Sequence, residues 1–322
     1  MGTLYAFPYT GRNGLIGRWN RVVRRWQRGG VEDYALLGGR QQPRLLPARH
    51  PDESLEVSEP HIHLPGLPEA FAGYRIVHIT DVHYGLFLPL EAVADTVELA
   101  NALEPDLIAL TGDFVTFSRS CIEPVAIVLG RLRARDGVFA VLGNHDFRVG
   151  ATAVARALRR EGIEVLRNRH TMLRRRGQSL YLAGIDDLRY RADLPRALRG
   201  VPAGAPTLLL SHNPGIIEQA AAHRVSLVLA GHTHGGQVNL PFFGNVYARR
   251  RGGMRFKLGW DCLGATQIYV SRGIGTVVVP VRYRCPAEIP HLRLLPATRA
   301  LHPPVYPRDV APDGRTRCTS ST

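Results

Sequence analysis

Side chains that bind metal ions recur along the middle of the sequence, and nearly all of them come directly after a predicted β-strand. Asp81 and His83 follow the strand predicted at 74–80, and Asp113 follows the strand at 106–111. The later strands are followed by Asn144, His145, His212, His232 and His234. Ligands collect at the carboxyl ends of strands in open α/β sheets, so we expect these side chains to line one crevice.

The chemistry of such a cluster is that of a metal centre. A lone Asp after a strand is usually a turn former and a lone His a core residue, but a joint cluster of buried carboxylates and imidazoles is costly unless cations neutralise it. Asp81 and His83, like His232 and His234, are two residues apart, which places both members on one face of an extended segment. Glycines beside the cluster would let ions approach closely: Gly112, Gly143, Gly231, Gly235 and Gly236.

The elements around these residues predict a layered α/β (α+β) domain beginning near Tyr74. Apolar residues at helical spacing predict helices at 91–103, 121–135, 152–162 and 213–223, between short buried strands. The segments 163–168, 170–176 and 179–184 are expected to be adjacent, partly antiparallel strands. Further strands are predicted at 138–142, 207–212, 225–231, 267–273 and 288–295.

Five motifs in order, DVH, GDF, GNHD, the isolated His212 and GHTH, resemble those of the calcineurin-like metallophosphoesterases over residues 75 to about 240. The resemblance implies a two-layered β-sandwich flanked by helices, with two divalent ions at its edge. It assigns Asp113 as the bridge and His145 as the proton donor to the leaving group or the stabiliser of its charge. It assigns one ion to Asp81, His83 and His234, and the other to Asn144, His212 and His232. The other reading of His145 is a residue that hydrogen-bonds to the ligands without touching the substrate.

The implied reaction is hydrolysis of a phosphodiester or pyrophosphate bond by metal-activated hydroxide. Oxygen and nitrogen ligands without a thiolate suit Mn, Fe or Zn and do not choose among them. Thr116 stands where protein phosphatases carry the second Asp of GDxxDRG, which argues against a protein substrate. The longer forms GDFV, LSHNP, GHTHGGQ and SRGIGT…PVRYRCPAEI resemble a bacterial branch of phosphodiesterases and UDP-2,3-diacylglucosamine pyrophosphatases, the latter being the alternative function.

The net charge of +14 favours an anionic partner, although only Lys257 among 41 basic residues is lysine, as genome bias also produces. The expected partner is a small phosphorylated substrate, with a nucleotide-linked lipid as one candidate. A nuclease or nucleic-acid binder is the further alternative, but the basic residues form no single stripe. No protein partner is predicted. The candidate substrate contacts are Arg249, Arg250, Arg251, Arg272 and Arg282, although a solvated basic loop fits the first three equally well.

We expect a basic, partly irregular extension at 1–65, a catalytic domain at 66–296 and a disordered tail at 297–322. The chain has no apolar run of about 18 residues and no recognisable signal segment, which favours the bacterial cytoplasm. An amphipathic helix at 15–26 either touches the inner membrane peripherally or packs on the domain's own flank. The four cysteines form no metal or disulfide pattern and are expected to be free thiols.

Overall fold

A computed structural model describes residues 55–85, 87–240, 244–245, 258–278 and 280–297. The predicted helix at 15–26, the arginines at 249–251 and the predicted tail after residue 297 lie outside these residues. Within the described residues, no helix has the length and apolarity needed to cross a membrane.

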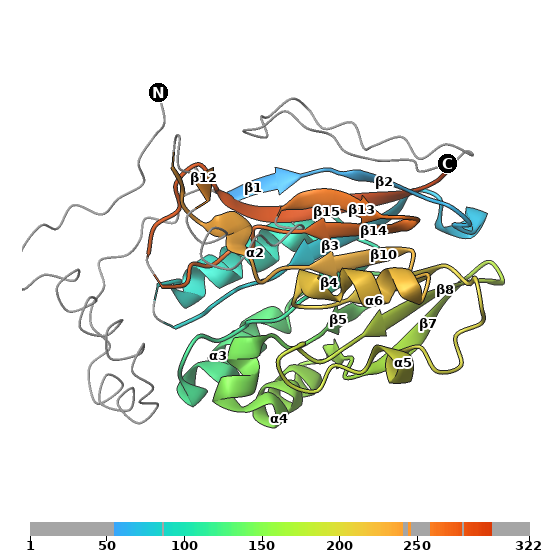
Figure 1. The fold of residues 1–322 in the computed structure, drawn as a ribbon. Coiled ribbons are helices and arrows are strands. Elements are labelled where there is room, and N and C mark those ends of the chain that lie inside the picture. The colour runs from blue at the N-terminus through green and yellow to red at the C-terminus, as the bar shows by residue number, and fades with distance from the viewer. Residues whose placement is uncertain (1–54, 86, 241–243, 246–257, 279, 298–322) are drawn as a thin grey trace, which may run out of the picture.

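Two β-sheets form the centre of the fold, and helices lie on their outer faces (Figure 1). In the first sheet β3, β4, β5 and β6 run parallel, while β15 pairs antiparallel with β3 and parallel with β1 and β2. Its strands are β1 (Leu55–Ser58), β2 (His61–Leu64), β3 (Tyr74–Ile79), β4 (Leu107–Leu110), β5 (Val138–Ala140), β6 (Glu164–Val165) and β15 (Ala287–Pro296).

The second sheet has the order β13-β14-β10-β9-β8-β7, with antiparallel pairs at both edges and parallel pairs between them. Its strands are β7 (Arg169–Arg175), β8 (Gln178–Gly184), β9 (Thr207–Leu210), β10 (Leu227–Ala230), β13 (Gly259–Leu263) and β14 (Thr266–Val270). Outside the two sheets, β11 (Asn239–Leu240) pairs antiparallel with β12 (Gly244–Asn245). The predicted two-layered β-sandwich is confirmed.

Alternation along the strands produces three apolar layers. Ile76 in β3 and Leu208 in β9 lie in the core between the sheets, whereas the next residue of each strand contacts helices on an outer face. The first sheet is covered by α2 (Leu90–Ala102), α3 (Ile122–Leu129) and α4 (Asn144–Arg160), and the second by α5 (Leu194–Ala197) and α6 (Ile217–Ala222). The sandwich is therefore buried on both faces, as its short apolar strands require.

Two boundaries differ from the sequence-based expectation for local reasons. Helix α3 ends at Leu129 and not near 135, because the N–H groups of Arg131 and Leu132 bond to carbonyls three residues back in a turn that does not continue the helix. Helix α4 begins at Asn144, where the Asp146 side chain accepts the N–H of the N-cap residue, Gly143. Gly150, with a φ of 140°, interrupts α4, and the part after this kink agrees with the helix predicted at 152–162. The early start places Asn144 and His145 in the first turn of a helix.

The predicted group of three adjacent strands is wrong in one respect. The β7–β8 pair is antiparallel as expected, but β6 pairs in parallel with β5 in the other sheet. The chain changes sheets at Asn168, whose φ of 50° lies in the left-handed region that asparagine tolerates. At the N-terminal side, β1 and β2 extend the first sheet beyond the domain boundary predicted at residue 65.

Candidate metal centre

The residues of the five motifs follow the ends of β3, β4, β5, β9 and β10, and the structure buries all of them. The buried set comprises Asp81, His83, Asp113, Asn144, His145, His212, His232 and His234. Three overlapping groups of these side chains have ligand atoms within 4.8 Å of one another. The predicted convergence of the Asp and His side chains is therefore observed.

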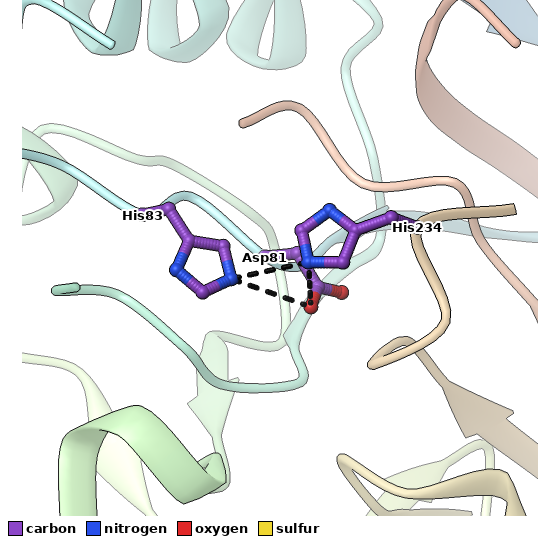
Figure 2. Close-up of side chains that lie close together, drawn as sticks. All are labelled: Asp81, His83 and His234. Atoms are coloured by element: carbon purple, nitrogen blue, oxygen red, sulfur yellow. Dashed lines mark hydrogen bonds and ion pairs between the residues drawn. The ribbon is translucent and has the colours of Figure 1, made fainter. Parts of the chain in front are cut away.

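The first group contains Asp81, His83 and His234 (Figure 2). The Nε2 atoms of His83 and His234 are 3.1 Å apart, and Asp81 Oδ1 lies 3.8 Å from the former and 3.2 Å from the latter. Ligands that bind one metal ion at about 2.1 Å are separated from one another by about 3.0–3.4 Å in tetrahedral or octahedral geometry. Two of the three separations lie in this range, and the His83–Asp81 separation of 3.8 Å exceeds it by about 0.4 Å. A small movement of one side chain would bring all three atoms to the spacing of ligands of a single ion.

The second group contains Asp113, His212 and His232. His212 Nε2 lies 3.2 Å from Asp113 Oδ2 and 3.0 Å from His232 Nδ1. The same Asp113 oxygen is 3.5 Å from His83 Nε2 in the first group. Asp113 therefore stands between the two groups, where a bridging carboxylate would stand.

Asn144 supports the fit of a metal ion in a different way. Its side-chain Oδ1 is buried and has no hydrogen-bond partner among the described residues. A buried amide oxygen without a partner costs roughly 1–3 kcal/mol, and a cation at the site would remove that cost. The donor set of carboxylate, imidazole and amide oxygen fits a hard or borderline divalent ion.

Charges within the cluster favour metal-binding forms for two members. Burial alone would raise the pKa of Asp113, but the imidazoles of His212, His145 and His83 hold it well below its usual range. Burial lowers the pKa of His83 well below its usual value and keeps that ring neutral. Burial also opposes the charged form of His212, yet nearby carboxylates, Asp113 foremost, raise its pKa to about 10. Binding of a metal ion by His212 would therefore require the loss of a proton from that ring.

The backbone at five of the candidate ligands is strained. Asp81, His83, Asp113, His232 and His234 all have φ between 50° and 70°. Non-glycine residues rarely adopt this left-handed conformation, and each costs roughly 1–3 kcal/mol when the surrounding structure enforces it. Because strands β3 and β10 have already ended, these tight turns and not extended strand geometry bring the side chains close to one another.

His145 is oriented toward the same cluster by its own backbone and ring. Its N–H donates to Asp113 Oδ1 at 2.7 Å, and its ring Nδ1 lies 2.9 Å from the carbonyl oxygen of Thr116. Because a carbonyl only accepts, Nδ1 carries the hydrogen and Nε2 is left for chemistry. The ring contacts that of His83 edge-on, with centroids 4.8 Å apart. Thr116 thus orients His145 through its carbonyl, without the Asp of protein phosphatases.

Asp146 is a supporting residue that the sequence interpretation did not single out, although it is the last letter of GNHD. Its carboxylate accepts the backbone N–H groups of Asp113, Phe114, Val115 and Gly143 at 2.8–3.3 Å. It therefore ties the Asp113 loop to the first turn of α4. Four converging N–H donors require an oxygen acceptor, which explains a buried carboxylate beside the cluster.

Of the five arginines predicted to contact the substrate, the structure describes two, Arg272 and Arg282. Arg282 is 8% exposed, and its Nη2 donates to the carbonyls of Arg272, Gly273 and Gly275. Arg272 pairs with Glu56 and Glu288. The structure therefore engages both guanidinium groups within the protein, and these contacts support a role in holding the 272–275 segment. Arg249, Arg250 and Arg251 lie outside the described residues.

Comparison with known proteins agrees with the geometry. Residues 74–236 match the Metallophos family, described as calcineurin-like phosphoesterase. The chain is 33% identical to "Phosphodiesterase YaeI" of Escherichia coli (strain K12), over 70% of this chain and 83% of that protein. It is 32% identical to "Uncharacterized metallophosphoesterase YkuE" of Bacillus subtilis (strain 168), over 73% and 84%.

Among solved structures, a 5'-nucleotidase precursor from Thermus thermophilus matches with a TM-score of 0.41 and 16% identity, over 69% of this chain and 54% of that one. A structural likeness at this level carries no inference about function. The functional inference depends instead on the sequence relatives and on the site. The family uses two divalent metal ions, and the buried Asp and His groups are compatible with them. The chain therefore belongs to the calcineurin-like phosphoesterases and is a hydrolase of phosphoester bonds.

Proposed function

We propose that this chain hydrolyses phosphodiester bonds at a centre in which Asp113 bridges two ions. In this proposal Asp81, His83 and His234 bind one ion, and Asn144, His212 and His232 bind the other. The observation that carries it is the position of Asp113 Oδ2, within 3.5 Å of imidazole nitrogens from both groups. The name of the Escherichia coli relative, a phosphodiesterase, supports the same class of substrate.

Two divalent ions held by these residues would supply positive charge for binding the phosphoryl group and would make hydroxide available near neutral pH. The protein supplies the remaining steps. His145, held through Nδ1 by the Thr116 carbonyl, presents Nε2 toward the cluster, and in its protonated form donates a hydrogen to the departing oxygen. Because Asp113 Oδ1 accepts the His145 N–H, one carboxylate fixes both the cluster and the proton donor.

The experiment that tests this function compares metal-loaded and chelator-stripped wild type on four substrates. These are bis-p-nitrophenyl phosphate, p-nitrophenyl phosphate, UDP-2,3-diacylglucosamine and a single-stranded oligonucleotide. We expect the loaded protein to prefer the diester, and stripping to lower its kcat/KM at least about 100-fold, reversibly on addition of Mn²⁺. Equal rates for loaded and stripped protein on every substrate would contradict the proposal.

The same panel separates the alternatives. A preference for UDP-2,3-diacylglucosamine would move the assignment to a pyrophosphatase that acts on a nucleotide-linked lipid. A preference for the oligonucleotide would move it to a nuclease, the class that the net charge of +14 allows. We propose the diester because neither alternative has support from the described contacts.

Substitution of His145 by Ala gives a second prediction. Since His145 contributes a proton and no required ligand, the variant should bind the same number of ions as wild type while kcat falls about 100- to 10,000-fold. Metal analysis and steady-state kinetics on bis-p-nitrophenyl phosphate check both parts. Loss of bound metal in the folded variant would show that His145 is a ligand instead.

A further inference from the structure

The loop between β8 and α5 brings an arginine to the second ligand group. Nη2 of Arg189 lies 3.4 Å from Nε2 of His232, the ring nitrogen that faces away from His212. The Arg189 side chain is exposed, so it reaches the centre from the solvent side. Arg189 belongs to none of the five motifs.

Asn168 pins this loop at both ends. Its Oδ1 accepts the N–H groups of Asp186 and Asp193, each at 3.0 Å, and its Nδ2 donates to the carbonyl of Arg191 at 2.7 Å. The backbone N–H of Arg189 donates to Asp187 Oδ1 at 3.0 Å. Backbone held in this way presents a side chain at a fixed place, which is what binding of a small charged group requires.

A second contact fixes the start of the loop. Arg167 donates to both carboxylate oxygens of Asp186 at 2.8 Å, in the two-point geometry of a strong charge-assisted pair. Arg189 has no such partner: within the described part of the chain, no carboxylate lies within 4.0 Å of its guanidinium. The backbone of Arg189 is thus held in place, while the positive charge of its guanidinium has no direct ion pair among the described residues.

The Arg189 guanidinium and Nε2 of His232 are both hydrogen-bond donors when His232 binds a metal ion, so the pair needs a common acceptor. If Nδ1 of His232 binds a cation, as its place 3.0 Å from His212 Nε2 indicates, the ring hydrogen resides on Nε2, which then only donates. Arg189 also only donates. Two donors 3.4 Å apart cannot satisfy each other, whereas one anionic oxygen placed between them accepts from both.

We propose that Arg189, positioned by Asn168, binds a phosphoryl oxygen of the substrate together with the Nε2–H of His232. This inference rests on the proposed function. His145 belongs to a group with His83 and Asp113, and His232 is not a member of that group. Because Arg189 contacts His232, Arg189 and His145 lie beside different members of the cluster and would contact the phosphoryl group from different directions. Arg189 therefore serves binding of the phosphoryl group, and His145 serves departure of the leaving group.

The test uses Mn-loaded protein and inorganic phosphate as the probe. Arg189→Ala should weaken phosphate binding about 10- to 100-fold by isothermal titration calorimetry, and should raise its inhibition constant equally. The KM for bis-p-nitrophenyl phosphate should rise with it. Arg189→Lys keeps the positive charge but loses the planar set of guanidinium donors, so its phosphate affinity should lie between that of wild type and that of Arg189→Ala. The matched control is Arg191→Ala, which removes the same charge from the same loop and should bind phosphate as wild type does.

Asn168→Ala tests the positioning role. It should weaken phosphate binding while Arg189 is still present, and the double variant Asn168→Ala/Arg189→Ala should be little worse than Arg189→Ala alone. Metal analysis of each variant should give the wild-type number of ions. Full additivity of the two losses would overturn the role of Asn168.

Two results would overturn the role of Arg189. The first is unchanged phosphate affinity in Arg189→Ala, and the second is a loss of affinity that is matched by loss of bound metal. Both are distinct from failure of the proposed function, in which metal-loaded wild type would itself hydrolyse none of the four substrates.

Discussion

Asp113→Asn is expected to lower kcat/KM for bis-p-nitrophenyl phosphate at least about 1,000-fold, more than the loss of a single transition-state donor usually costs. The amide should keep its oxygen on the His145 N–H, where Asp113 Oδ1 now lies. Its NH₂ group then replaces Oδ2, the atom that lies close to both His83 and His212. In the proposed centre, a donor without negative charge would therefore stand where a shared carboxylate oxygen would be required.

The matched control is Asp136→Asn. This substitution makes the same chemical change to a carboxylate that pairs with Arg175 and accepts from the Tyr74 hydroxyl, away from the metal groups. We expect it to reduce stability by about 1–3 kcal/mol while leaving kcat/KM near the wild-type value. If folded Asp113→Asn kept more than a tenth of wild-type activity, the bridging role would be wrong.

Gly231→Ala is expected to have the second largest effect. A Cβ at this position would lie 2.2 Å from Asp81 Oδ2 and from Thr80 Oγ1. The carboxylate of Asp81 cannot easily withdraw, since it accepts the His232 N–H at 2.9 Å. The added methyl group should therefore displace a ligand of the first group, and a displacement of about 1 Å is enough to lower activity about 100-fold. Metal content and kcat/KM measure both effects.

A control for glycine strain is available at Gly162. Its φ of 84° disfavours alanine, but nothing lies within 4 Å of the added Cβ. Gly162→Ala should cost about 1 kcal/mol of stability and retain metal and activity. Equal metal content in Gly231→Ala and Gly162→Ala would show that crowding at Asp81 does not control the site.

Much of the site was predictable because strand ends and motif order are local features of the sequence. Short apolar runs marked β3, β4, β9 and β10, and the side chains that follow them do converge. The two-residue period nevertheless predicted the wrong arrangement for one pair. His232 and His234 do not share one face, because left-handed turns direct the two side chains to different groups. The resemblance to the family implied this arrangement, whereas the two-residue period of a strand did not.

Other parts of the site depend on contacts between distant segments and leave no local signal. Asn168 reaches Asp193 across 25 residues, and Arg189 reaches His232 across 43. The change of sheet after β6 likewise follows from pairing with β5, which the sequence spacing of the three segments does not encode. By contrast, a role for Asp146 could have been predicted from the sequence, since Asp146 is the last residue of the GNHD motif.

The central claim is that two ions share Asp113, and the number of ions bound per chain tests it most directly. Stripped protein should be reloaded with Mn²⁺, freed of excess metal, and analysed by inductively coupled plasma mass spectrometry. We predict two ions per chain for wild type and at most one for folded Asp113→Asn, because only a bridging ligand weakens both sites at once. One ion in wild type, or two in Asp113→Asn, would contradict it.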